Sequence, residues 1–316
     1  MSDMMEDKNI KEETNWFARA IDSDIFYSFT RSKLVMVAAF VTFAYFFIAL
    51  FAPILATQNP FDLGSLDLMD GLTPPAWQEG GSSKFLIGTD DQGRDLLSAI
   101  MYGSRISLAV GFTSVFCAAL LGISLGLISG YFGGFIDTLI MRIADIQLTF
   151  PSILIALLID GTVSALFPEV RREDSAFWVL VLAISLSFWV QYARTVRSSV
   201  LVEKEREYVQ AAKLIGLRPF IIMLRHVLPN VLGPVLVIAT INLALAIITE
   251  ATLSFLGVGI PVTQPSLGTL IRIGQDFLFS GEWWITIFPG VALAIIVLSV
   301  NLVGDWLRDA LNPKLR

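Results

Sequence analysis

The sequence predicts an all-α, polytopic membrane protein with six transmembrane helices, and three observations lead to this fold class. First, 55% of the 316 residues are hydrophobic and only 16% are charged, whereas soluble domains average about 25% charged residues. Second, six apolar segments are each long enough to cross a bilayer, which takes about 20 helical residues. Third, lysine and arginine are distributed asymmetrically among the connections between these segments. A single cysteine and a single histidine exclude an internal disulfide framework and a multi-histidine metal site.

The six predicted spans follow one another along the chain with polar connections between them. They cover residues 34–55, 106–128, 136–159, 176–192, 231–256 and 284–307. Pro151 lies inside the third span, where we expect it to kink the helix because proline cannot donate a main-chain hydrogen bond.

The basic residues set the expected orientation in the membrane. Sixteen of the 22 lysines and arginines lie on the side of the two termini and of the 193–230 connection, and six lie on the other side. Because cytoplasmic loops carry the excess of lysine and arginine, we expect both termini and this connection in the cytosol. No basic patch free of acidic residues suggests a nucleic-acid partner.

Three units are expected along the chain. Residues 1–32 form a cytosolic segment, either a helix on the membrane surface or a frayed tail, residues 33–104 hold the first span and an external loop, and residues 105–316 form a five-helix core. The external loop is long, so we expect it to be ordered or functional. Its carboxylates Asp90, Asp91 and Asp95 surround Arg94, which argues against a calcium site and favours a turn followed by a helix cap.

Several residues within the spans invite a structural or functional hypothesis. Gly122, Gly126 and Gly130 lie on one helix face and predict a packing seam, within the chain or against a partner. Arg142 and Asp145 are three residues apart and are expected to pair as a structural clamp, with substrate contact as the alternative.

Asn242 and Glu250 are candidates for lining a translocation path, because polar groups at membrane depth are costly unless they serve a function. For Glu250 a cap or a pairing partner within the bundle is an equal alternative.

The connection before the fifth span carries the most informative pattern. Tyr208, Ala211, Ala212 and Ile215 recur at helical spacing, and Gly216 ends this helix. Pro219 then starts a second short helix at a position that needs no N–H donor. The two alanines are expected to leave a shallow surface that another protein can approach closely.

This connection resembles the "EAA" loop of permease subunits in ABC importers. The matching residues are Glu207, Tyr208, Gln210, Ala211, Ala212, Gly216, Pro229 and Asn230. Gln210 stands where glutamate is typical, and His226 stands where an aliphatic residue is typical. Further runs at residues 85–98, 130–134, 250–259 and 301–316 are similar to the second permease subunit of bacterial peptide importers.

The resemblance implies a type I ABC importer permease of the bacterial cytoplasmic (inner) membrane that moves di- or oligopeptides by alternating access. Its expected partners are a homologous second permease subunit, two ATP-binding subunits, an external (periplasmic) substrate-binding protein and membrane lipid. No phosphate-binding loop and no catalytic constellation occurs in the sequence. We therefore expect no catalytic, cofactor or metal site on this chain, with ATP and magnesium used by the partner ATPases.

Three alternatives are open at this stage. The same permease fold carries nickel, glutathione or another small solute in similar proteins. An ion-driven secondary transporter would need a buried carboxylate that cycles protons, and Glu250 is the one feature of the sequence in its favour. A non-transporting membrane scaffold would explain the exposed loop, but not the other family motifs.

Overall fold

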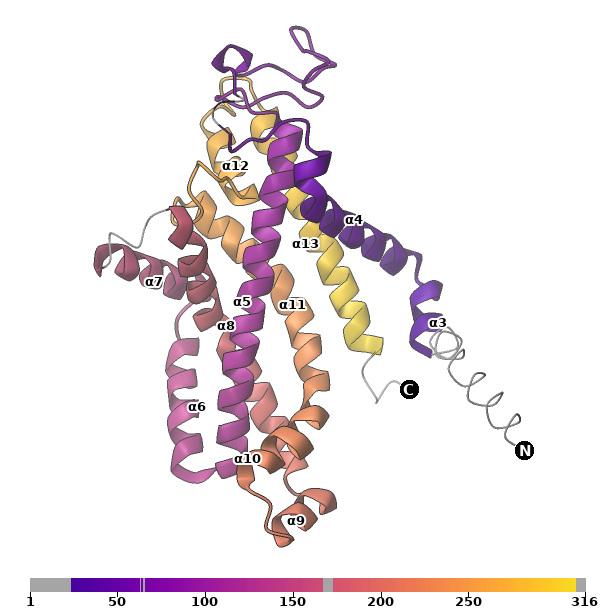
Figure 1. The fold of residues 1–316 in the computed structure, drawn as a ribbon, viewed down its shortest axis with the longest axis vertical. Helices are drawn as coiled ribbons and strands as arrows, with labels where there is room; N and C mark the ends of the chain where they lie inside the picture. The colour runs from indigo at the N-terminus through magenta and orange to yellow at the C-terminus, as the bar shows by residue number, and fades with distance from the viewer. Residues whose placement is uncertain (1–23, 63, 65, 167–172, 311–316) are drawn as a thin grey trace, which may run out of the picture.

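The computed structural model describes residues 24–62, 64, 66–166 and 173–310. Within these ranges the chain is a bundle of helices, and its extended pairing is limited to an isolated bridge between Thr89 and Asp95 (Figure 1). The helices are α3 (Asp24–Arg31), α4 (Lys33–Leu55), the 3-10 turn η2 (Leu68–Asp70), α5 (Leu96–Phe132), α6 (Gly134–Leu148), α7 (Ser152–Leu166), α8 (Glu173–Glu203), α9 (Glu207–Leu214), α10 (Pro219–Ile221), the π-helical turn η4 (Ile222–Val227), α11 (Leu228–Phe255), α12 (Leu267–Gln275) and α13 (Trp284–Ala310).

Five of the six predicted spans are present as single long helices, but the third is not one kinked helix. Five helices in the described ranges are long and apolar enough to cross a membrane, and α6 with α7 makes a sixth span that bends by 96°. Pro151 lies between these two helices, where its ring removes an N–H donor and disfavours helical geometry at Phe150. The predicted kink is therefore a complete break.

The centre of the bundle is the contact between α5 and α8, which depends on three glycines of α5. A Cβ atom added at Gly122 would lie 2.4 Å from Cβ of Tyr192, and one at Gly126 would lie 2.6 Å from the Ala193 carbonyl oxygen. At Gly130 the nearest atom would be Cβ of Val200, at 2.8 Å. The predicted packing seam is confirmed, and it lies within the chain.

Both central helices are longer than their predicted spans. Helix α5 has 37 residues and α8 has 31, so α5 is about 55 Å long at 1.5 Å per residue. The end of α8 continues past its apolar stretch because its charged side chains find partners on neighbouring helices. Arg197 Nε donates to Asp137 Oδ1 at 2.5 Å, and Lys204 Nζ donates to the Gly130 carbonyl at 3.0 Å. The predicted 193–230 connection therefore begins inside α8.

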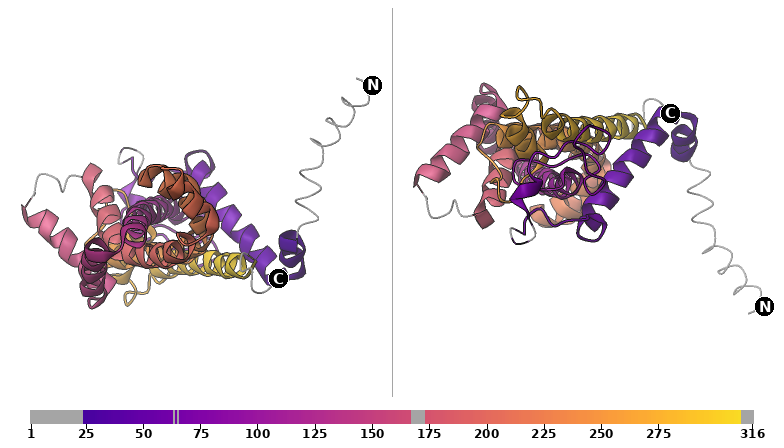
Figure 2. Two further views of the ribbon diagram at one scale, coloured as in Figure 1. Left: turned by 90° about the horizontal axis from the view of Figure 1, so that it is seen from below. Right: turned by 90° about the horizontal axis from the view of Figure 1, so that it is seen from above.

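The remaining helices flank this centre on two sides (Figure 2). Helices α4 and α13 pack together on one flank, where Tyr45 Oη donates to the Ala292 carbonyl at 3.1 Å, and α6 and α7 lie on the other. The outward face of α4 is strongly apolar and exposed, as at Phe40 and Phe43.

The predicted division at residue 104 falls inside α5 and stays a prediction. The expected surface helix of residues 1–32 lies largely outside the described ranges.

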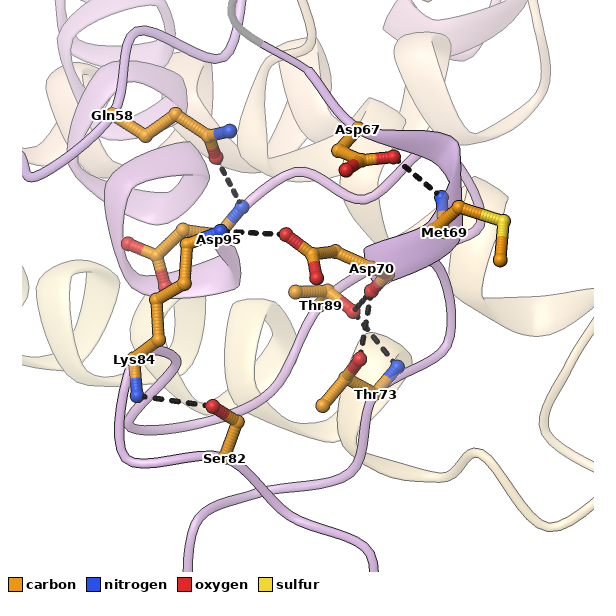
Figure 3. A network of polar contacts seen from close by, with 9 residues as sticks. All are labelled: Gln58, Asp67, Met69, Asp70, Thr73, Ser82, Lys84, Thr89 and Asp95. Atoms are coloured by element: carbon orange, nitrogen blue, oxygen red, sulfur yellow. Dashed lines mark hydrogen bonds and ion pairs between the residues drawn. The ribbon is translucent and has the colours of Figure 1, made fainter.

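The long loop between α4 and α5 is ordered by a network of polar contacts, as Figure 3 shows. The Asp70 carbonyl accepts from the hydroxyls of Thr73 and Thr89 at 2.8 and 2.6 Å, and the Asp70 carboxylate pairs with Lys84 Nζ at 2.6 Å. Trp284 Nε1 on α13 donates to the Thr89 carbonyl at 3.1 Å. The loop is thus fixed to the bundle, as its length predicted.

The carboxylates of this loop form the predicted turn and helix cap. Asp95 is the N-cap of α5, and its Oδ2 accepts from the Ser98 N–H at 3.0 Å. Arg94 is almost fully buried and donates through Nε to Asp90 Oδ2 at 2.5 Å and through Nη1 to the Val262 carbonyl at 3.1 Å. A carboxylate that already neutralises a buried arginine is a poor calcium ligand, so the structural interpretation of these residues is confirmed.

Candidate functional site

The segment after α8 turns twice and returns to the bundle, as its sequence signals predict. Helix α9 ends at Leu214, and Gly216 has a φ of +79°, a left-handed conformation that glycine adopts without steric cost. Pro219 is the first residue of α10. The second predicted helix is not a separate element, because α10, the π-helical turn and α11 run on continuously as Pro219–Phe255.

A polar cluster fixes α9 against the start of α11. Asn230 Nδ2 donates to Tyr208 Oη at 2.9 Å and to the His226 carbonyl at 2.8 Å. The Tyr208 hydroxyl in turn donates to the carboxylate of Glu203 at the end of α8. Partial burial and the neighbouring Glu203 carboxylate both raise the pKa of Tyr208. The predicted residues Tyr208 and Asn230 are thus brought together, and Glu203 is a partner that the sequence analysis missed.

Gln210 closes the turn between α8 and α9. Its Nε2 donates to the Lys204 carbonyl at 3.0 Å and lies 3.3 Å from Glu205 Oε2. A glutamate at this position could not donate these bonds, because an ionised carboxylate only accepts. Glu207, also predicted here, is exposed in the first turn of α9. Pro229 is exposed in the first turn of α11.

The two alanines of the predicted shallow surface lie on different faces of α9. Ala212 is buried with Val209 and belongs to the apolar core that includes Ile222, whereas Ala211 is exposed. The exposed apolar side chains near Ala211 are large. Leu214 is 88% exposed, Ile215 75% and Phe220 65%. We call Ala211, Leu214, Ile215 and Phe220 the α9 tip.

The α9 tip corrects the sequence-based expectation of a small-residue surface. Sequence reasoning missed Leu214 and Phe220, although two large apolar residues flanking Gly216 in a charged connection are themselves a signal. Exposed apolar groups of this size at the end of a bundle are typical of a protein contact. Figure 1 shows that the tip lies at the end of the molecule opposite the loop that precedes α5.

The predicted ion pair between Arg142 and Asp145 is wrong. Asp145 on α6 instead pairs with Arg194 on α8. The partner lies 49 residues further along the chain, so that spacing on one helix could not reveal it. Arg142 is exposed. The actual pair joins two helices, and both side chains are about half exposed.

The two candidates for a translocation path are fully buried within the subunit. Asn242 on α11 is 0% exposed, and both polar atoms of its amide lack a hydrogen-bond partner. Glu250 is also 0% exposed, and its Oε1 accepts from Ser254 Oγ at 2.7 Å. Glu250 therefore pairs within the bundle, one of the two roles considered for it. A role of either residue in a path stays a prediction.

No group of three or more histidine, cysteine or acidic side chains with the geometry of a metal site occurs among the described residues. The catalytic, cofactor and metal expectations are not tested by this observation.

The fold is a bundle of helices long and apolar enough to cross a membrane, with the apolar α9 tip exposed at one end. The family model for the inner membrane component of binding-protein-dependent transport systems matches residues 122–316. The chain belongs to this family. It is a transport component of the inner membrane, as the resemblance implied.

Relatives of described function make the assignment more particular. A dipeptide transport system permease protein of Haemophilus influenzae is 41% identical, over 85% of this chain and 86% of that protein. The protein of the same description from Escherichia coli K12 is 41% identical over 93% of both chains. A di/tripeptide transport system permease protein of Pseudomonas aeruginosa is 40% identical over 85% of this chain and 84% of its own.

A solved structure shows the same fold. A chain of the MetNI methionine ABC transporter, in an inward-facing conformation, superposes with a TM-score of 0.53 at 19% identity. The match covers 69% of this chain and 98% of that one. The all-α permease fold predicted from the sequence is confirmed.

Proposed function

We propose that this chain is a permease subunit of an ATP-driven importer that moves di- and oligopeptides from an external binding protein into the cytosol. The assignment of peptides as the cargo is supported by the identity of about 40% with three relatives described as dipeptide or di/tripeptide permeases. These matches extend over 84% or more of each chain, so they are not confined to a motif that all importers share.

The α9 tip is the proposed docking surface for a separate ATP-hydrolysing subunit. Its support is geometric: large apolar side chains are exposed around Ala211, while Tyr208, Asn230 and the buried Ala212 fix α9 to the bundle beneath them. A rigid protrusion of this kind transmits a push, whereas a flexible loop would absorb it. Nucleotide-driven movement of the ATPase would then tilt the spans and alternate access to the cargo path.

The complex proposed around this chain has four further parts. They are a homologous second permease, two ATP-binding subunits that use ATP and magnesium, and an external binding protein. This chain itself binds no cofactor in the proposal. Both termini and α9 lie in the cytosol, because sixteen of the 22 basic residues lie on that side, and the loop that precedes α5 faces the binding protein.

The test is uptake in cells with and without the gene for this chain. Labelled dipeptide, a longer peptide and nickel are offered separately, and the chain is restored from a plasmid. We expect loss of dipeptide uptake, which the wild-type gene restores. Loss of nickel uptake alone would instead assign the chain to the metal-carrying branch of the same fold.

The energy source is tested in the same cells. Depletion of ATP with the ion gradient held constant should stop uptake, because the proposed complex is driven by hydrolysis. Uptake that survives ATP depletion and ends when the gradient is dissipated would favour an ion-driven carrier. A scaffold would leave all three uptake rates unchanged when the gene is removed.

A further inference from the structure

A cavity of about 350 Å³ lies at the break between α6 and α7. Side chains of α6, α8 and α11 line it together with the residues around Pro151. Its volume is at the lower end of the range for small-molecule sites, about 300–1,000 Å³. Broken helices inside a membrane are tolerated where the freed backbone lines a cavity, and they are a frequent place for a transporter to bind its cargo.

Most polar groups of this cavity are already used within the protein. Gln147 Oε1 accepts from Trp189 Nε1 at 2.7 Å, and its Nε2 donates to the Leu186 carbonyl. Ser187 Oγ donates to the Ala183 carbonyl at 2.8 Å, and Thr249 Oγ1 donates to the Leu245 carbonyl at 2.8 Å. These bonds fix the walls of the cavity.

Gln191 is the exception among the side-chain amides of this cavity. It lines the cavity and is exposed, and its amide has no hydrogen bond to any of the described residues. In hydrocarbon an unsatisfied amide is costly, so this face of α8 is unsuited to lipid. The next exposed polar group on the same side of α8 is Arg194, one turn on, which pairs with Asp145. A polar strip thus leads from the cavity toward the charged end of α8.

We propose that this cavity is a cargo subsite and that the Gln191 amide binds the main chain of the transported peptide; this inference rests on the proposed function. A primary amide offers an N–H donor and a C=O acceptor side by side. In an extended peptide the N–H and C=O of one residue point to the same side of the chain, so that residue and the amide can pair reciprocally. Such a contact recognises the backbone shared by all peptides and ignores their side chains. The Gln147 amide is not available for such a contact, because it bonds to Trp189 and to the Leu186 carbonyl.

The first test measures whether position 191 is accessible to water and whether bound cargo reduces this access. The chain has a single cysteine, Cys117, so Cys117→Ser gives a background for one new thiol. Gln191→Cys in the assembled transporter is treated with a charged, membrane-impermeant thiosulfonate, which reacts with thiolates in water. Leu182→Cys is the matched control, since Leu182 is exposed nine residues earlier on α8 and hence on the opposite face.

We expect modification at position 191 and little at position 182. A dipeptide supplied with binding protein and ATP should slow the reaction at 191 at least about threefold, as occupancy of a site reduces its access. No modification at 191, or modification that the peptide leaves unchanged, would overturn the proposal.

The second test separates binding from folding through uptake. Gln191→Leu preserves the size of the side chain but removes its hydrogen bonds, while Gln191→Asn retains the amide. We expect Gln191→Leu to lower uptake about tenfold for peptides of unrelated sequence, as loss of a desolvated hydrogen bond does, and Gln191→Asn to lower it less. Equal uptake by the wild type and Gln191→Leu would refute the subsite.

The outcomes also distinguish this inference from the proposed function. If the wild-type complex imports peptide but Gln191→Leu is unaffected, only the subsite is wrong. If the wild-type complex imports no peptide at all, the proposed function is wrong and the subsite is lost with it.

Discussion

At the scale of single residues, adjacent alanines on α9 have opposite roles. Ala212 is 4% exposed and packs in the core, whereas Ala211 belongs to the α9 tip. Helical periodicity identifies the positions that share a face, but it does not tell which face the chain itself covers. The structure shows which of the two alanines is covered, so the same substitution at both positions gives a matched comparison.

Replacement of these alanines by glutamate should separate coupling from stability. Ala211→Glu places a charge on an exposed apolar surface, so we expect normal amounts of protein with uptake reduced at least about tenfold. Ala212→Glu buries an unpaired carboxylate and should reduce the amount of folded protein. Uptake and membrane levels of both variants are measured together. Near-normal uptake by a well-expressed Ala211→Glu protein would exclude the coupling role of the tip.

The buried pair of Arg94 and Asp90 is a second residue-scale prediction. The side chains are 2% and 0% exposed, and removal of one partner from such a pair typically costs about 3–5 kcal/mol. Asp90→Ala should therefore lower the thermal stability of the purified protein strongly. The double variant Asp90→Leu with Arg94→Met leaves no unpaired charge and should be clearly more stable than Asp90→Ala.

Asp91 gives a prediction about pH. Its burial, reinforced by the charge of Asp90, raises the pKa of the Asp91 carboxyl, and its Oδ1 has no hydrogen-bond partner. A raised pKa means that the folded protein holds this proton more tightly than the unfolded chain does. The contribution of Asp91 to stability is therefore greatest at low pH and is lost as the pH rises through its folded pKa.

Asp91→Asn removes the charge that the fold disfavours. We expect the variant to be more stable than the wild type at pH 7 and the two to converge toward pH 4. Thermal unfolding at both pH values measures the difference. A stabilisation that is independent of pH would mean that the charge is not its cause.

At the scale of elements, the contact between α5 and α8 depends on the absence of side chains. A Cβ atom at Gly126 would approach Cβ of Val196 to 2.8 Å, whereas one at Gly161 on α7 would meet nothing within 4 Å. Gly126→Val should destabilise the protein by about 1–3 kcal/mol, the usual cost of overpacking. Gly161→Val is the matched control, and thermal unfolding in detergent compares them. Equal melting temperatures of the two variants would contradict the seam.

The elements themselves were predictable where a local signal marks them. Asp95 before an apolar run, Gly216 after a periodic segment and Pro219 at a restart each act through the nearest few residues, and each lies where the sequence predicts. The length of α8 was not predictable from hydropathy, because its last turns are stabilised by partners on other helices. Arg197 bonds Asp137 across 60 residues of sequence.

The candidate site was predictable only in part for the same reason. The family motif includes Tyr208 and Asn230, which the structure joins by a hydrogen bond. The exposure of Leu214 and Phe220 and the pairing of Asp145 with Arg194 depend instead on tertiary packing. Gln191 carries no sequence signal at all. It becomes notable only when the break at Pro151 opens a cavity beside it.

At the scale of the whole molecule, the two ends of the bundle are built differently. The end that carries the loop before α5 is tied together by buried polar contacts such as those of Arg94 and Asp95. The opposite end exposes the apolar α9 tip. The loop end also exposes large apolar side chains, among them Met69 and Trp77, so the two ends differ in how they are held together rather than in the exposure of apolar groups.

Helix α5 connects these two ends as one uninterrupted rod. Its first turn is capped by Asp95 in the loop network, and near its last turn the Gly130 carbonyl accepts from Lys204, three residues before α9 begins. A rod of about 55 Å that rocks by about 5° displaces one end by about 5 Å relative to the other, almost the pitch of a helical turn. If a partner of the proposed complex tilts α5 at one end, the other end would be displaced without any change in the fold of the rod.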